Sequence, residues 1–334
     1  MSEPLTIALD AMGGDNAPGI VIKGANIARR RFPDVHFLVF GDENKIQPLL
    51  KKMPALVGAC TIVHTDKVIT NEAKPSLAVR QGKGSSMQMA IDSVRQGKAA
   101  GVVSAGNTGA LMAMAKLGLR MLPGIDRPAI AGVFPTLRNE LVMLDLGANV
   151  DCDADNLIQF AVMGGIFSRA VLGVLNPTVG LLNVGTEQVK GNSAVRQAAT
   201  ILSETTYPIS FHGFVEGDDI GKGSVDVIVA DGFSGNIALK TLEGTVRLYS
   251  DYLRNAFKSS LASRLGYVLA RRGLNKLRAR LDPRRYNGAM FVGLNGIVVK
   301  SHGGTDAFGF ANAIGVAIDM ASNNLNDKII EELA

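Results

Sequence analysis

The chain has 334 residues, of which 47% are hydrophobic and 19% are charged, and it contains 38 glycines. This length and composition exclude a disordered chain and are typical of a globular α/β protein with many strand-to-helix turns. The sequence begins without the pattern of a signal peptide, and no uninterrupted apolar stretch is long enough to span a bilayer. We therefore expect a cytoplasmic protein.

The positive charge is concentrated in one part of the chain. The formal net charge is +5, but residues 264–285 contain eight basic residues and one acid, which gives that segment a charge of +7. The rest of the chain is therefore slightly acidic, at −2. The basic character belongs to this segment and not to the whole protein.

Short apolar runs alternate with helical stretches along the first half of the chain. Buried strands are predicted at 6–9, 36–40, 61–64, 101–103 and 141–144. Residues 76–94 and 108–119, which lie between them, have helical spacing. This alternation predicts βαβ units and a mostly parallel sheet.

The same alternation resumes after Asp153. We predict a helix from there to about Val171, further helices at 192–204 and 306–321, and strands at 178–182, 209–211, 225–229 and 296–299. Between residues 242 and 265, apolar residues recur every three or four positions, which predicts a long amphipathic helix. We interpret residues 1–334 as one two-lobed domain with three α/β/α layers, from which a basic helical excursion, 242–288, protrudes.

Six of the apolar runs end in polar turns that contain glycine. These turns are 10–15, 104–109, 145–149, 183–187, 231–236 and 301–306. In a parallel sheet such turns gather at the carboxyl edge, where ligands bind. Glycine lets backbone N–H groups approach an anion, and a helix that starts in the turn attracts negative charge. The sequence therefore predicts a phosphate site at this edge, although any single turn is explained equally well as a tight turn or a helix cap.

Signatures of nucleotide and metal sites are missing from the sequence. Neither 82–84 nor 221–223 completes a GxxxxGK[ST] loop, and no GxGxxG follows a predicted strand. No HExxH motif or clustered His and Cys spacing occurs. Cys60 and Cys152 are far apart and are expected to be reduced and unreactive. We expect no cofactor and no metal.

Two side chains are candidates for chemistry. His302 lies in a Ser-His-Gly-Gly turn at the end of a predicted strand, which favours a function over packing. His36 and His64 fall within predicted strands and are expected to be structural, while His212 fits either role. Lys190 is the best-placed cation near a predicted strand end, although a solvated lysine is an equally good interpretation.

Six blocks of sequence carry a family resemblance. They are IALDAMGGDNAP, SAGNTGALMA, LDLGANVDC, LLNVGTEQVKGN, DVIVADGFSGNIALKTLEG and KSHGGTDAFGF, and they extend from Ile7 to about Met320. In this order they resemble the PlsX phosphate acyltransferases of bacterial phospholipid synthesis. The resemblance implies transfer of a fatty acyl group from acyl carrier protein to inorganic phosphate, with the acyl phosphate passed to a membrane glycerol-3-phosphate acyltransferase. It also implies a homodimer with a fold similar to isocitrate and isopropylmalate dehydrogenases and to phosphotransacetylase.

A mechanism without a covalent acyl enzyme fits both the turns and the resemblance. Phosphate is already an anionic nucleophile, so the protein has to hold it beside the thioester and stabilise the developing oxyanion and the departing thiolate. We assign phosphate binding to the turn amides with Asn107, Thr108 and Lys190, and proton donation to His302. The predicted catalytic residues are Asp10, Lys190, Asp231 and His302. The predicted substrate- and phosphate-binding residues are Gly13, Gly14, Asp15, Ser104, Asn107, Thr108, Gly109, Asn183, Gly235, Asn236, Ser301 and Gly303.

The basic segment also carries apolar residues. This combination suits an anionic bilayer surface, an acidic carrier protein, or both, and predicts a cytoplasmic enzyme that associates peripherally with the membrane. A solvated helical hairpin at a dimer interface is the alternative. The predicted surface residues are Arg264, Leu265, Tyr267, Val268, Leu269, Arg271, Arg272, Leu274, Lys276 and Leu277.

Two other kinds of function remain open from the sequence. A transacetylase that acts on coenzyme A thioesters, or a decarboxylating dehydrogenase with a metal-binding carboxylate cluster, would share the fold. A nucleic-acid-binding protein would use the basic segment and would show a steep salt dependence. The stacking rings there are limited to Tyr267 in that segment and Tyr286 directly after it, so we expect no nucleic acid partner.

Overall fold

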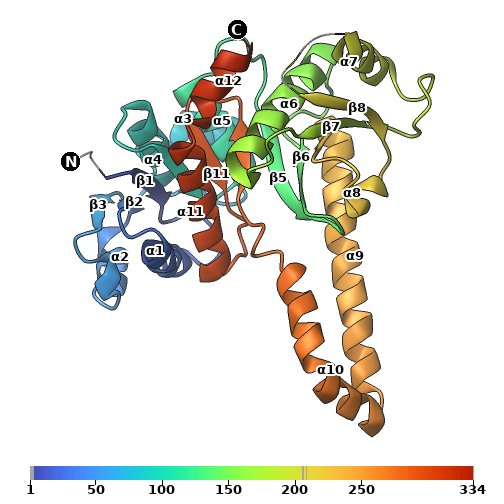
Figure 1. Cartoon of the computed structure of the whole chain (residues 1–334). Helices are drawn as coiled ribbons and strands as arrows, with labels where there is room; N and C mark the ends of the chain where they lie inside the picture. The colour runs from blue at the N-terminus through green and yellow to red at the C-terminus, as the bar shows by residue number, and fades with distance from the viewer. Residues whose placement is uncertain (1–3, 205–206, 208, 334) are drawn as a thin grey trace.

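The computed structural model describes residues 4–204, 207 and 209–333. Within this part of the chain, one sheet of eleven strands forms the centre of the molecule (Figure 1). The strands are β1 (Thr6–Asp10), β2 (His36–Gly41), β3 (Cys60–His64), β4 (Gly101–Ser104), β5 (Ala129–Pro135), β6 (Glu140–Leu144), β7 (Thr178–Leu182), β8 (Ser210–Val215), β9 (Val227–Val229), β10 (Ala289–Val292) and β11 (Ile297–Lys300).

The sheet has two parallel halves that run in opposite directions, separated by a short antiparallel region. Their order is β3-β2-β1-β4-β11-β10-β5-β6-β9-β7-β8, and neighbours pair in parallel from β3 to β11 and from β6 to β8. Between these halves, the pairs β11 with β10, β10 with β5, and β5 with β6 are antiparallel. Three antiparallel steps make the second half run opposite to the first. The carboxyl ends of the two halves therefore lie at opposite edges of the sheet.

Helices cover both faces of the sheet, which confirms the predicted three layers. Helices α1 and α11 pack against each other and share one core with α6, while α4 and α5 contribute to the core on the other face. Adjacent strand residues face different cores, as the pleat requires: Ile7 and Leu9 lie in the first and Ala8 in the second. The α-helices of the body are α1 (Gly19–Arg31), α2 (Glu43–Leu50), α3 (Pro75–Gln81), α4 (Ser86–Arg95), α5 (Thr108–Leu119), α6 (Ala154–Phe167), α7 (Ser193–Glu204), α8 (Asp219–Lys222), α11 (Ala307–Ser322) and α12 (Leu325–Leu333).

The helical excursion is a hairpin of two helices that extends away from the body (Figure 1). Its helices are α9 (Gly232–Lys258) and α10 (Leu261–Arg280). The single helix predicted for 242–265 is therefore wrong, because Ser260 caps a new helix by accepting a hydrogen bond from the backbone N–H of Ser263 at 3.0 Å. The described residues contain no helix that is long and apolar enough to cross a membrane.

Other differences from the predicted elements have local causes. Strands β5 and β10 were not predicted, and they are the two strands that reverse the direction of the sheet. The helix predicted at 76–94 is broken into α3 and α4, because Gly84 adopts a φ of +80° and Ser85 caps α4 through the backbone N–H of Gln88. The end of the helix predicted to reach Val171 is a π-helix, η2 (Ser168–Leu172).

Candidate active site

Asp10 connects the turns that follow β1 and β4 through hydrogen bonds. Its carboxylate is 1% exposed and accepts hydrogen bonds of 2.6 Å from the hydroxyls of Ser86 and Ser104. Burial raises the pKa of Asp10, and the hydrogen bonds from Ser104 and Ser86 act in the opposite direction. A side chain at Gly13 would place its Cβ 2.5 Å from Asp10 Oδ2. Asp10 and the fully buried Ser104 therefore position the turns and do not line the open site.

Three turns of the first half of the sheet meet around one hollow. The backbone N–H of Asp15 donates to the carbonyl of Gly303 at 3.0 Å. Gly14 has a φ of +99°, and a Cβ there would lie 2.8 Å from Ala105 Cβ, so the β1 and β4 turns are in close contact. The hollow has a volume of about 390 Å³ and is lined by Asp15, Asn71, Ala105, Gly106, Asn107, Thr108, Gly109, Lys300 and Gly303.

Lys300 is the cation of this hollow, although it was not among the predicted site residues. It is the last residue of β11, and its ammonium donates to the carbonyls of Ala105, at 3.4 Å, and of Ser301. Burial lowers the pKa of Lys300 to about 8, although the charges of Asp10 and Asp15 act to raise it. The signal was present in the sequence, because Lys300 directly precedes the Ser-His-Gly-Gly turn.

Helix α5 starts at the same hollow. Asn107 caps the helix by accepting from the backbone N–H of Ala110 at 2.9 Å, and its Nδ2 donates to the carbonyl of Asn71 at 2.6 Å. Thr108 and Gly109 form the first turn, where backbone N–H groups have no carbonyl one turn earlier to bind. These two N–H groups and the helix dipole favour an anion beside Lys300.

Asp15 lines the hollow, and its predicted contact with phosphate stays a prediction. Its Oδ1 accepts a hydrogen bond of 2.8 Å from Asn71 Nδ2, so the carboxylate holds the loop that forms one wall of the hollow. An ionised carboxylate would also repel phosphate. We propose that Asp15 maintains the shape of the hollow through Asn71, while its negative charge acts to raise the pKa of Lys300.

His302 lies in the turn between Lys300 and Gly303, and its side chain is exposed. The backbone N–H of Gly304 donates to its Nδ1 at 3.2 Å, so the neutral imidazole carries its proton on Nε2. The Nε2–H group is then available as a donor. Ser301, also predicted to bind substrate, is 0% exposed and accepts from Asn287 Nδ2 at 2.8 Å, so it holds the turn instead.

The prediction that all six turns gather at one edge is wrong. The turns after β6, β7 and β9 lie at the opposite edge, because of the reversal of the sheet at β10 and β5. Lys190 and Asn183 follow β7, and Asp231, Gly235 and Asn236 follow β9. The structure therefore does not bring these five predicted site residues together with His302 and Asn107 within one chain.

The turns at this opposite edge have clear structural roles. Asp145 is fully buried and accepts five hydrogen bonds, four of them from the backbone N–H groups of Ile130, Gly147, Ala148 and Asn149. Asp231 caps α9 through the backbone N–H of Ser234 at 2.7 Å, and a Cβ on Gly235 would lie 1.9 Å from the Asp145 carbonyl oxygen. Asn236 lies beside Gly147.

The loop that carries Lys190 is held by Asn183. Asn183 Nδ2 donates to the carbonyls of Gly185, at 3.1 Å, and Lys190, at 3.2 Å. The Lys190 side chain is exposed. Its predicted contact with phosphate stays a prediction.

A larger hollow of about 470 Å³ lies beside the β5–β6 hairpin and the end of α10, and we do not place the site there. Its two arginines are already engaged: Arg138 pairs with Asp226, and Arg280 Nη2 donates to the carbonyl of Thr136 at 2.8 Å. None of the six glycine turns contributes to its lining.

The two cysteine thiols are poor nucleophiles, as predicted. Burial raises the pKa of Cys60 to about 12 and the pKa of Cys152 to about 11, and Asp145 adds to the shift at Cys152. Among the described residues, no group of three or more His, Cys, Asp or Glu side chains is arranged to hold a metal ion.

The predicted surface residues lie on α10, every residue of which is at least partly exposed. Leu265 and Val268 are each 63% exposed and Leu269 is 80% exposed. Tyr267 is half-buried, because its ring packs edge-on against Phe257 of α9 with centroids 5.5 Å apart. The structure therefore presents basic and apolar side chains together on the hairpin, with α9 and α10 in contact.

Comparison with known proteins gives one consistent family. Residues 5–328 match the family described as fatty acid synthesis protein. A phosphate acyltransferase of Rhodospirillum centenum is 64% identical over all of this chain and 94% of its own, and one of Paramagnetospirillum magneticum is 60% identical over 99% of this chain and 95% of its own.

Solved structures show the same fold at low identity. A phosphotransacetylase from Streptococcus pyogenes superposes with a TM-score of 0.66 at 17% identity, covering 96% of this chain and 95% of its own. A branched-chain phosphotransacylase from Enterococcus faecalis gives 0.60 at 13% identity, covering 95% and 99%. The similarity to the phosphotransacetylase fold that the resemblance implies is thus confirmed, and the chain belongs to the fatty acid synthesis protein family, the PlsX family, whose relatives named above are phosphate acyltransferases.

Proposed function

We propose that the chain transfers a fatty acyl group from an acyl carrier protein thioester to inorganic phosphate, giving acyl phosphate and free carrier protein. The observation that supports this most directly is the half-buried ammonium of Lys300 in a hollow that also receives the first turn of α5. A single cation and unpaired backbone N–H groups suit a small dianion such as phosphate. The relatives that match 99% or more of the chain are named phosphate acyltransferases, which supports phosphate as the acyl acceptor.

The reaction needs few groups from the protein. A phosphate oxygen forms a bond to the thioester carbon, the carbon–sulfur bond breaks, and the electron pair leaves on sulfur. The proton carried by hydrogenphosphate ends on the carrier thiol, so no oxidant or further reactant is required. Lys300 and the α5 amides hold the nucleophile, and the Nε2–H of His302 donates to the developing oxyanion or to the departing sulfur.

The test is direct detection of the product. The purified chain is incubated with acyl carrier protein that carries a long-chain fatty acyl thioester, together with labelled phosphate. Labelled acyl phosphate and free carrier protein are then measured. We expect both to form in equal amounts. Turnover of coenzyme A thioesters with none from acyl carrier protein would favour a transacylase, and no product from either donor would contradict the proposal.

We also propose that the exposed face of α10 binds an anionic bilayer surface. Six basic residues lie on this helix between Arg264 and Arg280, among apolar side chains that are largely exposed. A basic helix with exposed leucines gains both electrostatic attraction and apolar burial at such a surface. Flotation with anionic vesicles should carry the protein upward, and neutral vesicles or the variant Leu269→Glu should not. Equal flotation with both lipids, or binding to acyl carrier protein alone, would contradict it.

A homodimer is proposed as well, since α9 leaves apolar side chains exposed along its length. A monomer rarely leaves such a row uncovered, and a second copy of the hairpin would cover it. Analytical ultracentrifugation should give twice the mass of the chain, and a monomer at micromolar concentration would contradict the proposal. The exposed residues are Leu248, Tyr249 and Tyr252, at 54%, 59% and 67%.

A further inference from the structure

The chain that returns from α10 to the sheet lies against the turn that carries His302. We call residues 282–287 the strap. Asn287, its last residue, is 9% exposed, and its Oδ1 accepts a hydrogen bond of 2.9 Å from the backbone N–H of His302. Its Nδ2 donates to the hydroxyl of Ser301 at 2.8 Å and of Thr305 at 3.4 Å. One buried amide thus binds three residues of a single turn.

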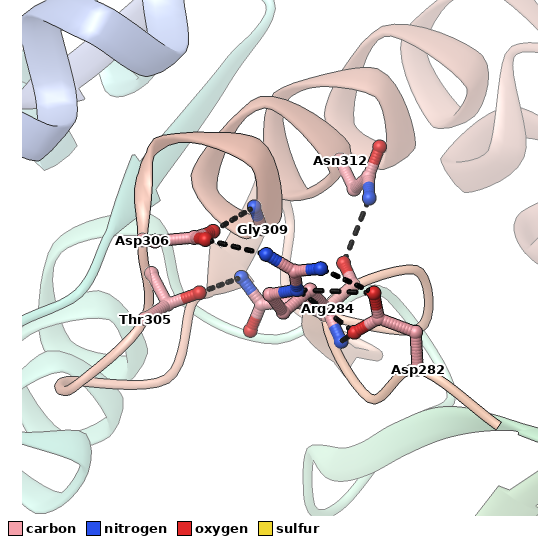
Figure 2. Close-up of polar contacts among 7 residues, drawn as sticks. Asp282, Arg284, Thr305, Asp306, Gly309 and Asn312 are labelled. Carbon is pink, nitrogen blue, oxygen red and sulfur yellow. Dashed lines mark hydrogen bonds and ion pairs between the residues drawn. The ribbon is translucent and has the colours of Figure 1, made fainter. Parts of the chain in front are cut away.

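Arg284 makes a second connection, to the other end of the same turn (Figure 2). Its Nη1 donates to Asp306 Oδ2 at 2.8 Å, while its Nε and Nη2 donate to Asp282 at 2.6 to 3.0 Å. Asp306 uses its other oxygen to cap α11, accepting from the backbone N–H of Gly309 at 3.0 Å. The cap of α11 and the strap therefore share one carboxylate.

The first turns of α11 complete the connection. Asn312 Nδ2 donates to the carbonyl of Arg284 at 2.7 Å, as Figure 2 shows, and the Arg284 guanidinium lies over the Phe308 ring at 5.5 Å from its centroid. The space is tight, because a Cβ on Gly309 would lie 2.2 Å from Thr305 Oγ1 and 3.3 Å from Asn287 Nδ2. The turn therefore has little freedom to shift while the strap is in place.

The ion pair between Arg284 and Asp306 adds little to stability by itself. Arg284 and Asp306 have side chains 50% and 51% exposed, and ion pairs at such positions contribute little to stability. Yet their contacts, together with those of Asn287, converge on the six residues between Lys300 and α11. These six residues include the predicted proton donor and one wall of the hollow, Gly303.

We propose that Asn287 and Arg284 are positioning residues for acyl transfer, which hold His302 and Gly303 in register with Lys300. This inference rests on the proposed function, because it assigns the turn a task in that reaction. Neither side chain needs to touch substrate. The strap also starts at the end of α10, where Arg280 donates to the carbonyls of Thr136 and Leu137, so the same short segment joins the hairpin to the active site.

The test compares Asn287→Ala, Arg284→Ala and Arg284→Lys with two matched controls. Asn323→Ala removes an asparagine whose Nδ2 donates to the Asp319 carbonyl at the far end of α11, and Arg95→Ala removes a surface ion pair of 2.8 Å with Asp92. We expect both alanine variants of the strap to lower kcat tenfold to about 100-fold, with KM for phosphate changed less than threefold. Arg284→Lys should recover part of kcat, and the controls should match wild type.

A second measurement separates positioning from activity. Hydrogen–deuterium exchange of peptides covering 301–309 should become at least tenfold faster in Asn287→Ala, while peptides covering 10–15 and 104–109 keep wild-type rates. Wild-type protein that makes no acyl phosphate would contradict the proposed function, yet the exchange result would still report on the strap. Folded strap variants with wild-type kcat, or with unchanged exchange at 301–309, would overturn the inference.

Discussion

Lys300 offers the sharpest test of the site, because its removal should change activity and stability in opposite directions. The variant Lys300→Met keeps most of the aliphatic stem and removes the ammonium from the hollow. Phosphate loses its only proposed cation there, so kcat/KM for phosphate should fall on the order of 100-fold. Lys98→Met, at an exposed site, is the matched control.

The stability change follows from the pKa of Lys300. Burial lowers this pKa from 10.5 to about 8, and a difference of about 2.5 units corresponds to about 3 kcal/mol of cost to the folded state when the amine is charged. Removing the ammonium also leaves two backbone carbonyls without its hydrogen bonds, which offsets part of the gain. We expect Lys300→Met to raise the free energy of unfolding at pH 7 by about 1 to 3 kcal/mol.

The sign of the pH dependence provides a further check. Below pH 8 the folded and unfolded chains both carry the charge, so the folded state bears the full cost. Between about pH 8 and 10.5 the folded protein loses this proton first, so the Lys300 contribution to stability improves as pH rises. Urea unfolding at pH 7 and pH 10 isolates this contribution as a difference between variants: the stability of wild type and of Lys98→Met relative to Lys300→Met should be greater at pH 10 than at pH 7.

One result would refute the reasoning about Lys300. If Lys300→Met keeps the wild-type KM for phosphate and is no more stable than Lys98→Met, then the ammonium neither binds phosphate nor bears a burial cost. The assignment of the phosphate site to this hollow would then be wrong.

Three further predictions concern other parts of the molecule. Asp10→Ala should lower the free energy of unfolding by about 2 kcal/mol, measured with urea, because two serine hydroxyls lose their acceptor; a loss below 0.5 kcal/mol would speak against this role. His302→Gln should reduce kcat at least tenfold with an unchanged melting temperature, since the side chain is exposed; wild-type turnover would remove it from the mechanism. Gly235→Ala should destabilise the protein by about 1 to 3 kcal/mol, because its Cβ would lie 1.9 Å from a backbone oxygen. Gly244→Ala, in open space on the same helix, should stabilise the protein by about 0.5 kcal/mol. Calorimetry measures both changes, and equal effects would contradict the packing argument.

Local patterns in the sequence were enough to place most elements. The strand at 178–182 and the helix at 108–119 have the predicted bounds, because alternation and helical spacing are properties of neighbouring residues. The charge of the hairpin and the glycine turns are equally local. The block of residues around His302 was identified from the same kind of signal.

Only the tertiary structure decided which turns share a site. The sequence gives no direction to a strand, and the two unpredicted strands, β5 and β10, reverse the second half of the sheet. That reversal separates Lys190 and Asp231 from His302 within the chain. Ser301 and Asp10 were predicted as site residues, yet both are buried and hold the turns by hydrogen bonds.

Lys300 and the strap are functional features that local sequence patterns did not identify. Lys300 directly precedes the Ser-His-Gly-Gly turn in the sequence, but its neighbours along the chain do not show that its ammonium is buried. Its role depends on three turns that meet around that ammonium. Asn287 lies 14 residues before Ser301 and binds it only because β10 and β11 pair antiparallel. Residue types and local periodicity fixed the parts of this protein, whereas long-range strand pairing decided which parts meet, because pairing depends on contacts that no short stretch of sequence contains.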